Sequence, residues 1–250
     1  MDSSTDGAPL IHTPSVSRPH SPANGASASA KAVVCVFCGS SPGTSPAHVA
    51  AAQKLGEAFA AHNISLIYGG GTTGLMGEIA RTVVALSGPE AVHGVIPDAL
   101  IQFEQQGRSG PADVVKTGAP KAEIDEKIYG RTTVVPDMHT RKQLMAKKVM
   151  EGGPGSGFIA LSGGYGTLEE LAEVITWNQL GIHGKGVVVF NVEGYYDGLI
   201  EWVKSAVTAG FIAPGSAGIL VEGLDAEECV LALKEYRVAE GRLKLDWTQK

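Results

Sequence analysis

The sequence has few cysteines, and they do not form a metal-binding pattern. Cys35, Cys38 and Cys229 are the three cysteines among 250 residues. Cys35 and Cys38 form a C-x-x-C, but no second pair of ligands follows at the spacing of a zinc site. Because this pair lies in the apolar run "VVCVFCG", we expect both thiols to be small buried groups. Sparse cysteines are typical of a reducing compartment, which predicts a cytoplasmic protein. The missing second ligand pair predicts that there is no metal site.

The sequence also lacks a positive net charge and any long apolar segment. Its 20 Lys and Arg residues against 26 Asp and Glu residues give a net charge of −6. This charge argues against nucleic acid or an anionic membrane as a partner. No apolar run reaches the roughly 20 residues that span a bilayer. With 44% hydrophobic residues, the chain can build one sizeable core, and we expect a single folded domain.

The first thirty residues have no hydrophobic period. They are rich in Ser, Pro, Ala and Gly, and Arg18 is their only arginine. This composition fits neither a secretory signal nor an arginine-rich transit peptide. It cannot bury enough apolar surface to offset the entropy of ordering. We therefore predict a disordered tail over residues 1–30 and a folded domain over residues 31–250.

Beyond the tail, short apolar runs alternate with helical patterns. The runs are continuous, as expected of strands that are buried on both faces. This order predicts a single doubly wound, Rossmann-like α/β fold, in which helices cover both faces of a parallel sheet. Ligands of such folds bind beyond the carboxyl ends of the strands. The expected strands cover residues 33–37, 65–68, 91–96, 132–135, 158–161, 187–191 and 219–221, and the expected helices cover residues 46–62, 75–86, 138–150, 168–180, 196–209 and 226–238.

One polar stretch, residues 105–130, interrupts this alternation. It is punctuated by glycine and proline. Loops of this length are uncommon inside compact domains, and they lie on the surface or carry function. A solvated surface insertion and a lid over a site are both open interpretations.

Three glycine-rich corners each follow an expected strand and precede an expected helix. They cover residues 39–43, 68–78 and 163–166. In a parallel sheet all three lie at the same edge, where backbone N–H groups at helix N-termini can face an anion. The second corner matches G-x-G-x-x-G, although the dinucleotide motif normally occupies the first corner. A tight packing turn, an anion site and NAD binding therefore remain open for the second corner.

The third corner, "SGGYGTLEE", places its glycines before two adjacent glutamates. Glycines let a backbone approach a ligand closely, and Thr167 can cap the following helix or donate its hydroxyl to a phosphate. Glu170 has two interpretations, because Thr167-x-x-Glu170 is a capping box and a carboxylate beside a ligand can also act in catalysis. Ser162 is a poor candidate nucleophile, since no G-x-S-x-G elbow surrounds it.

Basic residues gather in "DMHTRKQLMAKK", residues 137–148 of an otherwise acidic chain. Such a run usually forms a solvated face. Arg141 and Lys142, however, fall in an early turn of the expected helix, where the helix dipole disfavours cations. Their position also permits an anionic partner, such as a phosphate or a carboxylate across the site.

Together these segments resemble a known family. "SGGYGTLEE" is similar to the P-G-G-x-G-T-x-x-E motif of the LOG phosphoribohydrolases, and "DMHTRK" is similar to the M-H-x-R-K element of that family. The resemblance covers residues 33–236. It implies a doubly wound fold, a homodimer and no cofactor. It also implies hydrolysis of the N-glycosidic bond of cytokinin (N6-substituted adenine) riboside 5′-monophosphates, with AMP as a further substrate.

The resemblance also implies the site residues. Arg141 and Glu170 fall on the catalytic pair of the family. The expected substrate contacts are Glu104, Arg141, Lys142, Gly163, Gly164, Tyr165, Gly166, Thr167, Leu168, Glu169, Glu170 and Thr176.

The chain departs from the family pattern in two ways. Ser162 replaces the proline of the motif, and residues 105–130 and 151–157 are longer than usual. These departures concern substrate choice more than reaction type. The alternative is a non-catalytic nucleotide or molybdenum-cofactor binding protein of the same fold. Trp177 and Leu180 are the expected contact residues of a homodimer.

Overall fold

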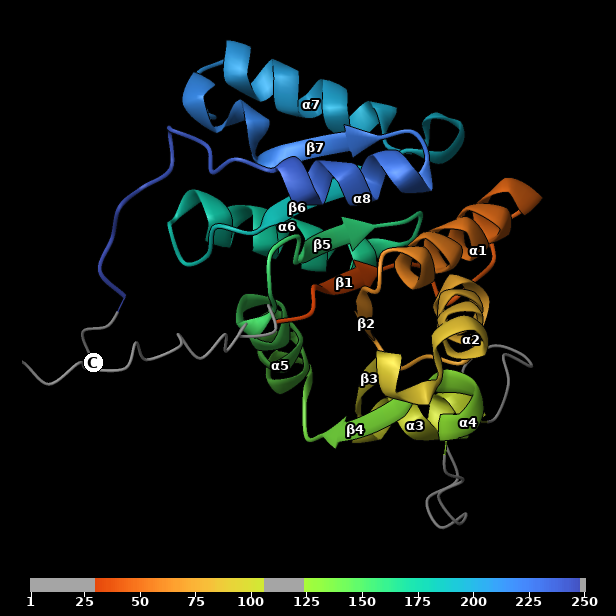
Figure 1. Ribbon diagram of the computed structural model, residues 1–250. Coiled ribbons are helices and arrows are strands. Elements are labelled where there is room, and N and C mark those ends of the chain that lie inside the picture. Colours follow the sequence, from red (N-terminus) through yellow and green to blue (C-terminus); the bar gives the residue numbers. More distant parts are fainter. Residues whose placement is uncertain (1–29, 106–123, 248–250) are drawn as a thin grey trace, which may run out of the picture.

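The structure is a computed structural model that describes residues 30–105 and 124–247. One seven-stranded sheet has the order β4-β3-β2-β1-β5-β6-β7, and every neighbouring pair is parallel. This confirms the predicted doubly wound α/β fold (Figure 1). The predicted tail lies outside the described residues, except for Ala30. The strands are β1 Val33–Phe37, β2 Ser65–Tyr68, β3 Val92–Pro97, β4 Arg131–Val135, β5 Gly157–Ala160, β6 Gly186–Phe190 and β7 Leu220–Gly223.

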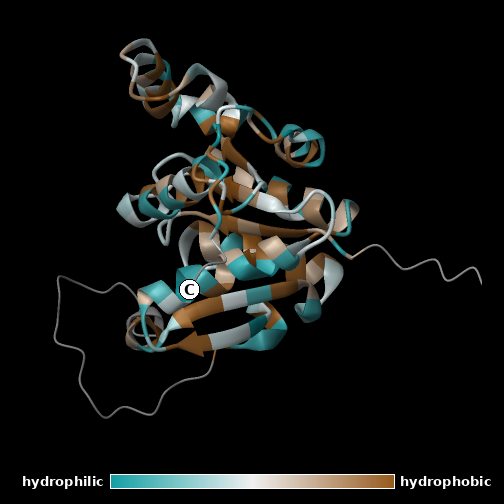
Figure 2. Cartoon of the chain, turned by 90° about the vertical axis from the view of Figure 1, so that its left-hand side faces the viewer, coloured by the Kyte–Doolittle hydropathy of each residue, from teal (hydrophilic) through white to brown (hydrophobic). Residues whose placement is uncertain are grey.

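Six helices cover the sheet where helical patterns were expected. They are α1 Pro46–Ala61, α2 Gly74–Ser87, α5 Met138–Glu151, α6 Tyr165–Gln179, α7 Asp197–Thr208 and α8 Ala226–Glu235. Helices α1, α2 and α8 pack on one face of the sheet, and α5, α6 and α7 pack on the other. The central strands contribute apolar side chains to both cores, and Figure 2 shows them largely in brown. Burial on both faces explains their continuous apolar runs.

Two short helices were not predicted. α3 (Asp98–Gln105) follows β3, and α4 (Glu126–Tyr129) lies at the end of the stretch that was expected to be an insertion. That stretch is therefore partly helical. It also contacts the sheet, because Tyr68 Oη donates to the carbonyl oxygen of Tyr129 at 3.1 Å. Residues 106–123 lie outside the described residues, so the choice between insertion and lid stays a prediction.

The three thiols are buried and free, which confirms the burial expected of Cys35 and Cys38 from their apolar surroundings. Burial raises the pKa of Cys229 to about 12, and it also raises the pKa of Cys35 and of Cys38. The described residues contain no cluster of His, Cys, Asp and Glu that could hold a metal ion. Among the described helices, none is long and apolar enough to cross a membrane.

Candidate active site

The strand order reverses between β1 and β5, and two glycine corners meet there. In doubly wound sheets the crevice at such a switch point is the usual ligand site. The N–H of Gly39, in the first corner, donates to the carbonyl oxygen of Ser162, in the third, at 2.9 Å. The carbonyl of Gly39 accepts from the N–H of Leu75 at 3.0 Å, which ties in the second corner. The expectation that the three corners lie at one edge is therefore confirmed.

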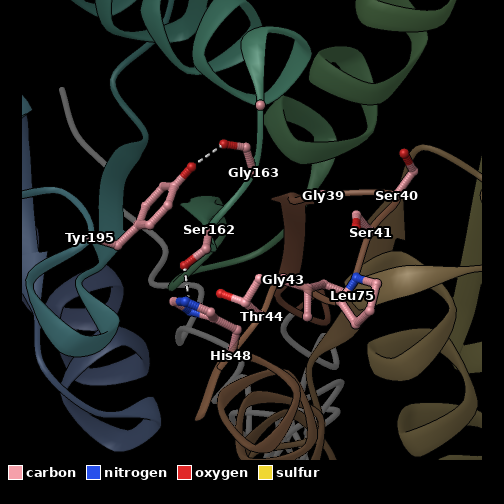
Figure 3. A pocket seen from close by; sticks show the side chains of 12 residues that line it. Gly39, Ser40, Ser41, Gly43, Thr44, His48, Leu75, Ser162, Gly163 and Tyr195 are labelled. Atoms are coloured by element: carbon pink, nitrogen blue, oxygen red, sulfur yellow. Dashed lines mark hydrogen bonds between the residues drawn. The ribbon is translucent and has the colours of Figure 1, made fainter. Parts of the chain in front are cut away.

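A cavity of about 450 Å³ opens between the first and third corners (Figure 3). Its walls come from residues 39–44, His48, Leu75, residues 162–164 and Tyr195. The cavity has the volume of a small-molecule site. Its lining does not include Arg141 or Glu170, because these two residues lie on the α5–α6 side of the third corner.

Arg141 of α5 and Glu170 of α6 form a buried pair. The guanidinium Nη2 lies 3.3 Å from the carboxylate Oε1, and the residues are 9% and 6% exposed. Burial raises the pKa of the Glu170 carboxyl, and the neighbouring Arg141 charge opposes this rise. The resemblance implied that the two side chains act together, and the fold brings them into contact.

Two buried polar atoms of the Arg141–Glu170 pair lack a hydrogen-bond partner within the described residues. The 3.3 Å contact is an ion pair by distance but is not aligned as a hydrogen bond. Within the described residues, Glu170 Oε1 and Arg141 Nε have no hydrogen-bond partner. Buried polar atoms in folded proteins are almost always hydrogen-bonded, and exceptions point to a water, an ion or a ligand. The pair therefore has capacity to bind a group that the protein does not supply.

The second glycine corner makes room for the arginine. A Cβ atom on Gly69 would collide with Nη2 of Arg141. Gly69 follows β2 directly, so the guanidinium lies against the backbone at the carboxyl edge of the sheet. The structure thus supports close packing as the reason for this glycine, one of the three interpretations of the second corner.

Lys142 is largely shielded from solvent and is already paired with carboxylates. Its ammonium group is paired with Glu169 at 2.5 Å and Glu173 at 3.2 Å, both from α6. The hydrogen bond with Glu169 raises the pKa of Lys142, and burial opposes the rise. The early basic residues of α5 are thus balanced by carboxylates of the neighbouring helix, one of the two anionic partners that the sequence had permitted.

The capping-box interpretation of Glu170 is wrong. Helix α6 begins at Tyr165, three residues earlier than expected, and its N-cap is Gly164 without a side-chain cap. Thr167 is a buried residue inside the first turn, and a Cβ on Gly163 would collide with its hydroxyl. Glu170 lies a full turn further along and cannot reach back to the N-cap N–H. Its side chain instead meets Arg141.

The start of α6 is open to a ligand. A Cβ on Gly164 or on Gly166 would meet nothing within 4 Å. Tyr165 is 94% exposed, and Leu168 is also exposed. Because no side chain caps this helix, its first N–H groups are available to an anion.

Of the predicted substrate contacts, Thr176 lies apart from the Arg141–Glu170 pair, and the side chain of Glu104 lies outside the described residues. Thr176 is nearly two turns beyond Glu170 on α6, donates its hydroxyl to Ala172, and lines a groove between α6 and α7. Glu104 belongs to α3, which follows the carboxyl end of β3, and its side chain is outside the described part of the chain. Sequence reasoning missed His48, which falls at the start of an expected helix, and Tyr195, which falls between an expected strand and an expected helix, because neither belongs to a motif.

Comparison with known proteins assigns the chain to a family. The model of a family described as "Possible lysine decarboxylase" matches residues 76–233. A cytokinin riboside 5′-monophosphate phosphoribohydrolase of Arabidopsis thaliana, LOG1, is 45% identical over 203 residues, which cover 81% of this chain and 83% of that protein. The chain belongs to the LOG family. Its predicted membership is thereby confirmed.

Other relatives of this LOG-family protein differ in length or in identity. It is 49% identical over 215 residues to a "Bifunctional cytokinin biosynthesis protein" of Fusarium pseudograminearum. These residues cover 86% of this chain but only 42% of that protein, so the chain spans less than half the length of this relative. A molybdenum cofactor carrier protein from Chlamydomonas reinhardtii has a similar structure, with a TM-score of 0.53. At 19% identity over 82% of this chain and 97% of the carrier, that likeness shows the fold alone.

Proposed function

We propose that this protein hydrolyses the N-glycosidic bond of cytokinin riboside 5′-monophosphates and of AMP, releasing the free base and ribose 5-phosphate. The observation that carries the proposal is the buried Arg141–Glu170 pair, whose unpartnered atoms lie beside an uncapped glycine corner. The relatives named as phosphoribohydrolases support the same activity.

Glu170 is the proposed catalytic carboxylate. Cleavage of a glycosidic bond passes through an oxocarbenium-like state with positive charge near C1′. A carboxylate held in a site of low dielectric stabilises that charge strongly. Oε1 of Glu170 has no hydrogen-bond partner within the described residues, so it can orient or deprotonate the attacking water.

Arg141 is the proposed partner of the substrate and of Glu170. Its charge opposes the burial effect on the Glu170 carboxyl, which keeps a larger fraction of that group ionised. The unpartnered Nε of Arg141 can donate to the ribose, the phosphate or the leaving base. Lys142 holds Glu169 and Glu173, so its proposed role is to position α6 against α5.

The third corner is the proposed phosphate site. Gly164 and Gly166 leave open space over the first N–H groups of α6. A phosphate bound there acts as a handle, because binding energy far from the reacting bond can be used to stabilise the transition state. The phosphate is not the reacting centre, so this mechanism requires no metal.

A homodimer and a cytoplasmic location complete the proposal. Trp202 and Leu168 are exposed and border an apolar groove between α6 and α7, which supports this face as the contact between two copies. Trp177, one of the expected contact residues, packs partly into the core of its own chain. The free, buried thiols fit a reducing compartment.

The proposed function predicts a strict need for the 5′-phosphate. AMP, isopentenyladenosine monophosphate and the matching ribosides are incubated with the enzyme, and released bases are quantified by chromatography. We expect the monophosphates to be cleaved and the ribosides to react far more slowly, because they lack the handle. Equal turnover of monophosphates and ribosides would contradict the proposed phosphate site. Binding of the nucleotides without release of base would favour the alternative, a non-catalytic carrier.

A further inference from the structure

His48 and Ser162 form a hydrogen-bonded pair in the wall of the corner cavity, the 450 Å³ space between the first and third corners. Nδ1 of His48 and the hydroxyl of Ser162 are 2.9 Å apart. His48 belongs to α1 and Ser162 follows β5, so the bond joins residues 114 positions apart. Neither side chain has a role in the mechanism proposed above, and Ser162 stands where the family motif has proline.

The pair leaves one ring nitrogen of His48 for a ligand. Within the described residues, Nε2 of His48 has no hydrogen-bond partner. When Ser162 donates to Nδ1, the neutral ring carries its proton on Nε2. When the ring is protonated, both nitrogens donate. In both of these states Nε2 is a donor, which suits an anion, whereas in the other neutral tautomer Nδ1 donates to Ser162 and Nε2 is an acceptor.

The other walls of the cavity suit the same kind of ligand. Ser41, Thr44, Gly163 and Gly164 also line it. Figure 3 shows His48, Ser162 and Tyr195 along one side and Ser41 on the other. Hydroxyls, an imidazole and glycine backbone are typical groups for holding a phosphate.

Tyr195 fixes the wall rather than the ligand. Its hydroxyl donates to the carbonyl oxygen of Gly163, and its ring meets the His48 ring edge-on at 5.7 Å. The tyrosine thus holds the third corner and the imidazole in place together. Gly43 has φ of +78°, a conformation that favours glycine, and a Cβ there would lie 3.1 Å from the His48 ring.

We propose that His48 binds the phosphate monoester of the substrate through Nε2, and that Ser162 positions its ring. The inference rests on the proposed function for the identity of the ester, but the contact itself is with the phosphate group. It makes His48 a specificity-determining residue for phosphorylated over unphosphorylated ribosides. It also gives the serine at the position of the family proline a purpose, since proline has no hydroxyl to hold the ring.

Two substitutions of His48 separate ligand binding from a structural role. The amide of Asn in His48→Asn falls near the position of Nδ1 and can keep the bond to Ser162. The longer amide of Gln in His48→Gln falls near Nε2 and can keep a donor toward the cavity. A ligand role predicts that Gln preserves phosphate affinity better than Asn, whereas a purely structural role predicts the reverse order.

The measurement is calorimetric titration of the full chain with inorganic phosphate and with ribose 5-phosphate. His48→Asn should lower both affinities by about 10- to 100-fold, the worth of a hydrogen bond to a charged group, and Ser162→Ala should lower them less. His48→Asn should also raise KM for AMP with little change in kcat. The matched control is His93→Gln, which breaks another histidine–hydroxyl bond, to Thr133 at 2.7 Å, away from the cavity.

The outcomes keep this inference distinct from the proposed function. If His48→Asn binds phosphate as tightly as the unaltered protein, or if it outperforms His48→Gln, the inference is overturned even when AMP is hydrolysed. If the unaltered protein hydrolyses no nucleotide but His48→Asn still loses phosphate affinity, the proposed function fails and the phosphate contact stands. A loss of helical signal in circular dichroism for either variant moves the test to Ser162→Ala, for which unchanged affinity overturns the positioning role.

Discussion

At the residue scale, two opposing effects act on the pKa of Glu170. Burial favours its protonated form, and the adjacent Arg141 favours its charged form. The sequence predicted the residue but not its surroundings, because the capping box and the catalytic carboxylate share one local pattern. What separates them is the start of α6 at Tyr165, which leaves Glu170 too far along the helix to reach the N-cap.

The raised pKa of Glu170 predicts a loss of activity in mild acid. Burial raises this pKa above the ordinary 4.5, and the mechanism needs the ionised form. The acidic limb of kcat/KM for AMP should therefore lie above pH 4.5. Rate measurements across pH 4–8 check this, and an acidic limb at or below 4.5 would contradict the burial argument.

The same shift has a consequence for stability with a defined sign. The folded protein binds the Glu170 proton more tightly than the unfolded chain, so this group stabilises the fold most below its unfolded pKa. Its contribution is lost as pH rises through the folded pKa. Thermal unfolding across that window should show a shallower dependence on pH for Glu170→Gln than for the unaltered protein.

At the element scale, the central strands were predictable because burial on both faces leaves continuous apolar runs. Short α3 and α4 were missed because, at 8 and 4 residues, neither is long enough for an apolar period to be detected. The sequence permitted a carboxylate partner for Lys142 but did not place it on α6, because that depends on which helices become neighbours and local sequence does not encode this.

The start of α6 predicts opposite effects for two neighbouring glycines. Gly163→Ala would drive a Cβ into Thr167, and such overpacking costs about 1–3 kcal/mol. Gly166→Ala meets open space and should leave the melting temperature unchanged or slightly raised. If the corner holds the phosphate, Gly166→Ala should nevertheless raise KM for AMP, because its methyl group occupies the space of the ligand. A stable Gly163→Ala variant would refute the packing argument.

At the scale of the whole molecule, the α6–α7 face is the proposed dimer contact. Trp202 is 62% exposed there. Trp202→Glu should convert the protein to a monomer in light scattering, because a charge cannot be buried in an apolar contact at low cost. Leu86→Glu is the matched control, since Leu86 is 57% exposed on α2. A monomer mass for the unaltered protein at micromolar concentration would rule out the dimer.

Parallel strands carry the glycine corners to one edge, so the sequence could predict which segments meet there. It could not predict which side chains would line the cavity. His48 and Tyr195 reach it from α1 and from the loop after β6, and neither belongs to a motif. Only the packing of the whole chain brings them to the switch point.

The central claim is that Glu170 is a catalytic carboxylate, and its most direct test is the rate of base release from AMP by Glu170→Gln. Gln keeps the size of the side chain but cannot accept the proton of water or offset the charge at C1′. We predict a rate about 10²–10⁴-fold lower, while AMP still binds and the circular dichroism spectrum is unchanged. Glu173→Gln, which removes a carboxylate whose one ion pair among the described residues is with Lys142, should retain most activity. Near-normal turnover by Glu170→Gln would show that Glu170 is structural and would contradict the mechanism.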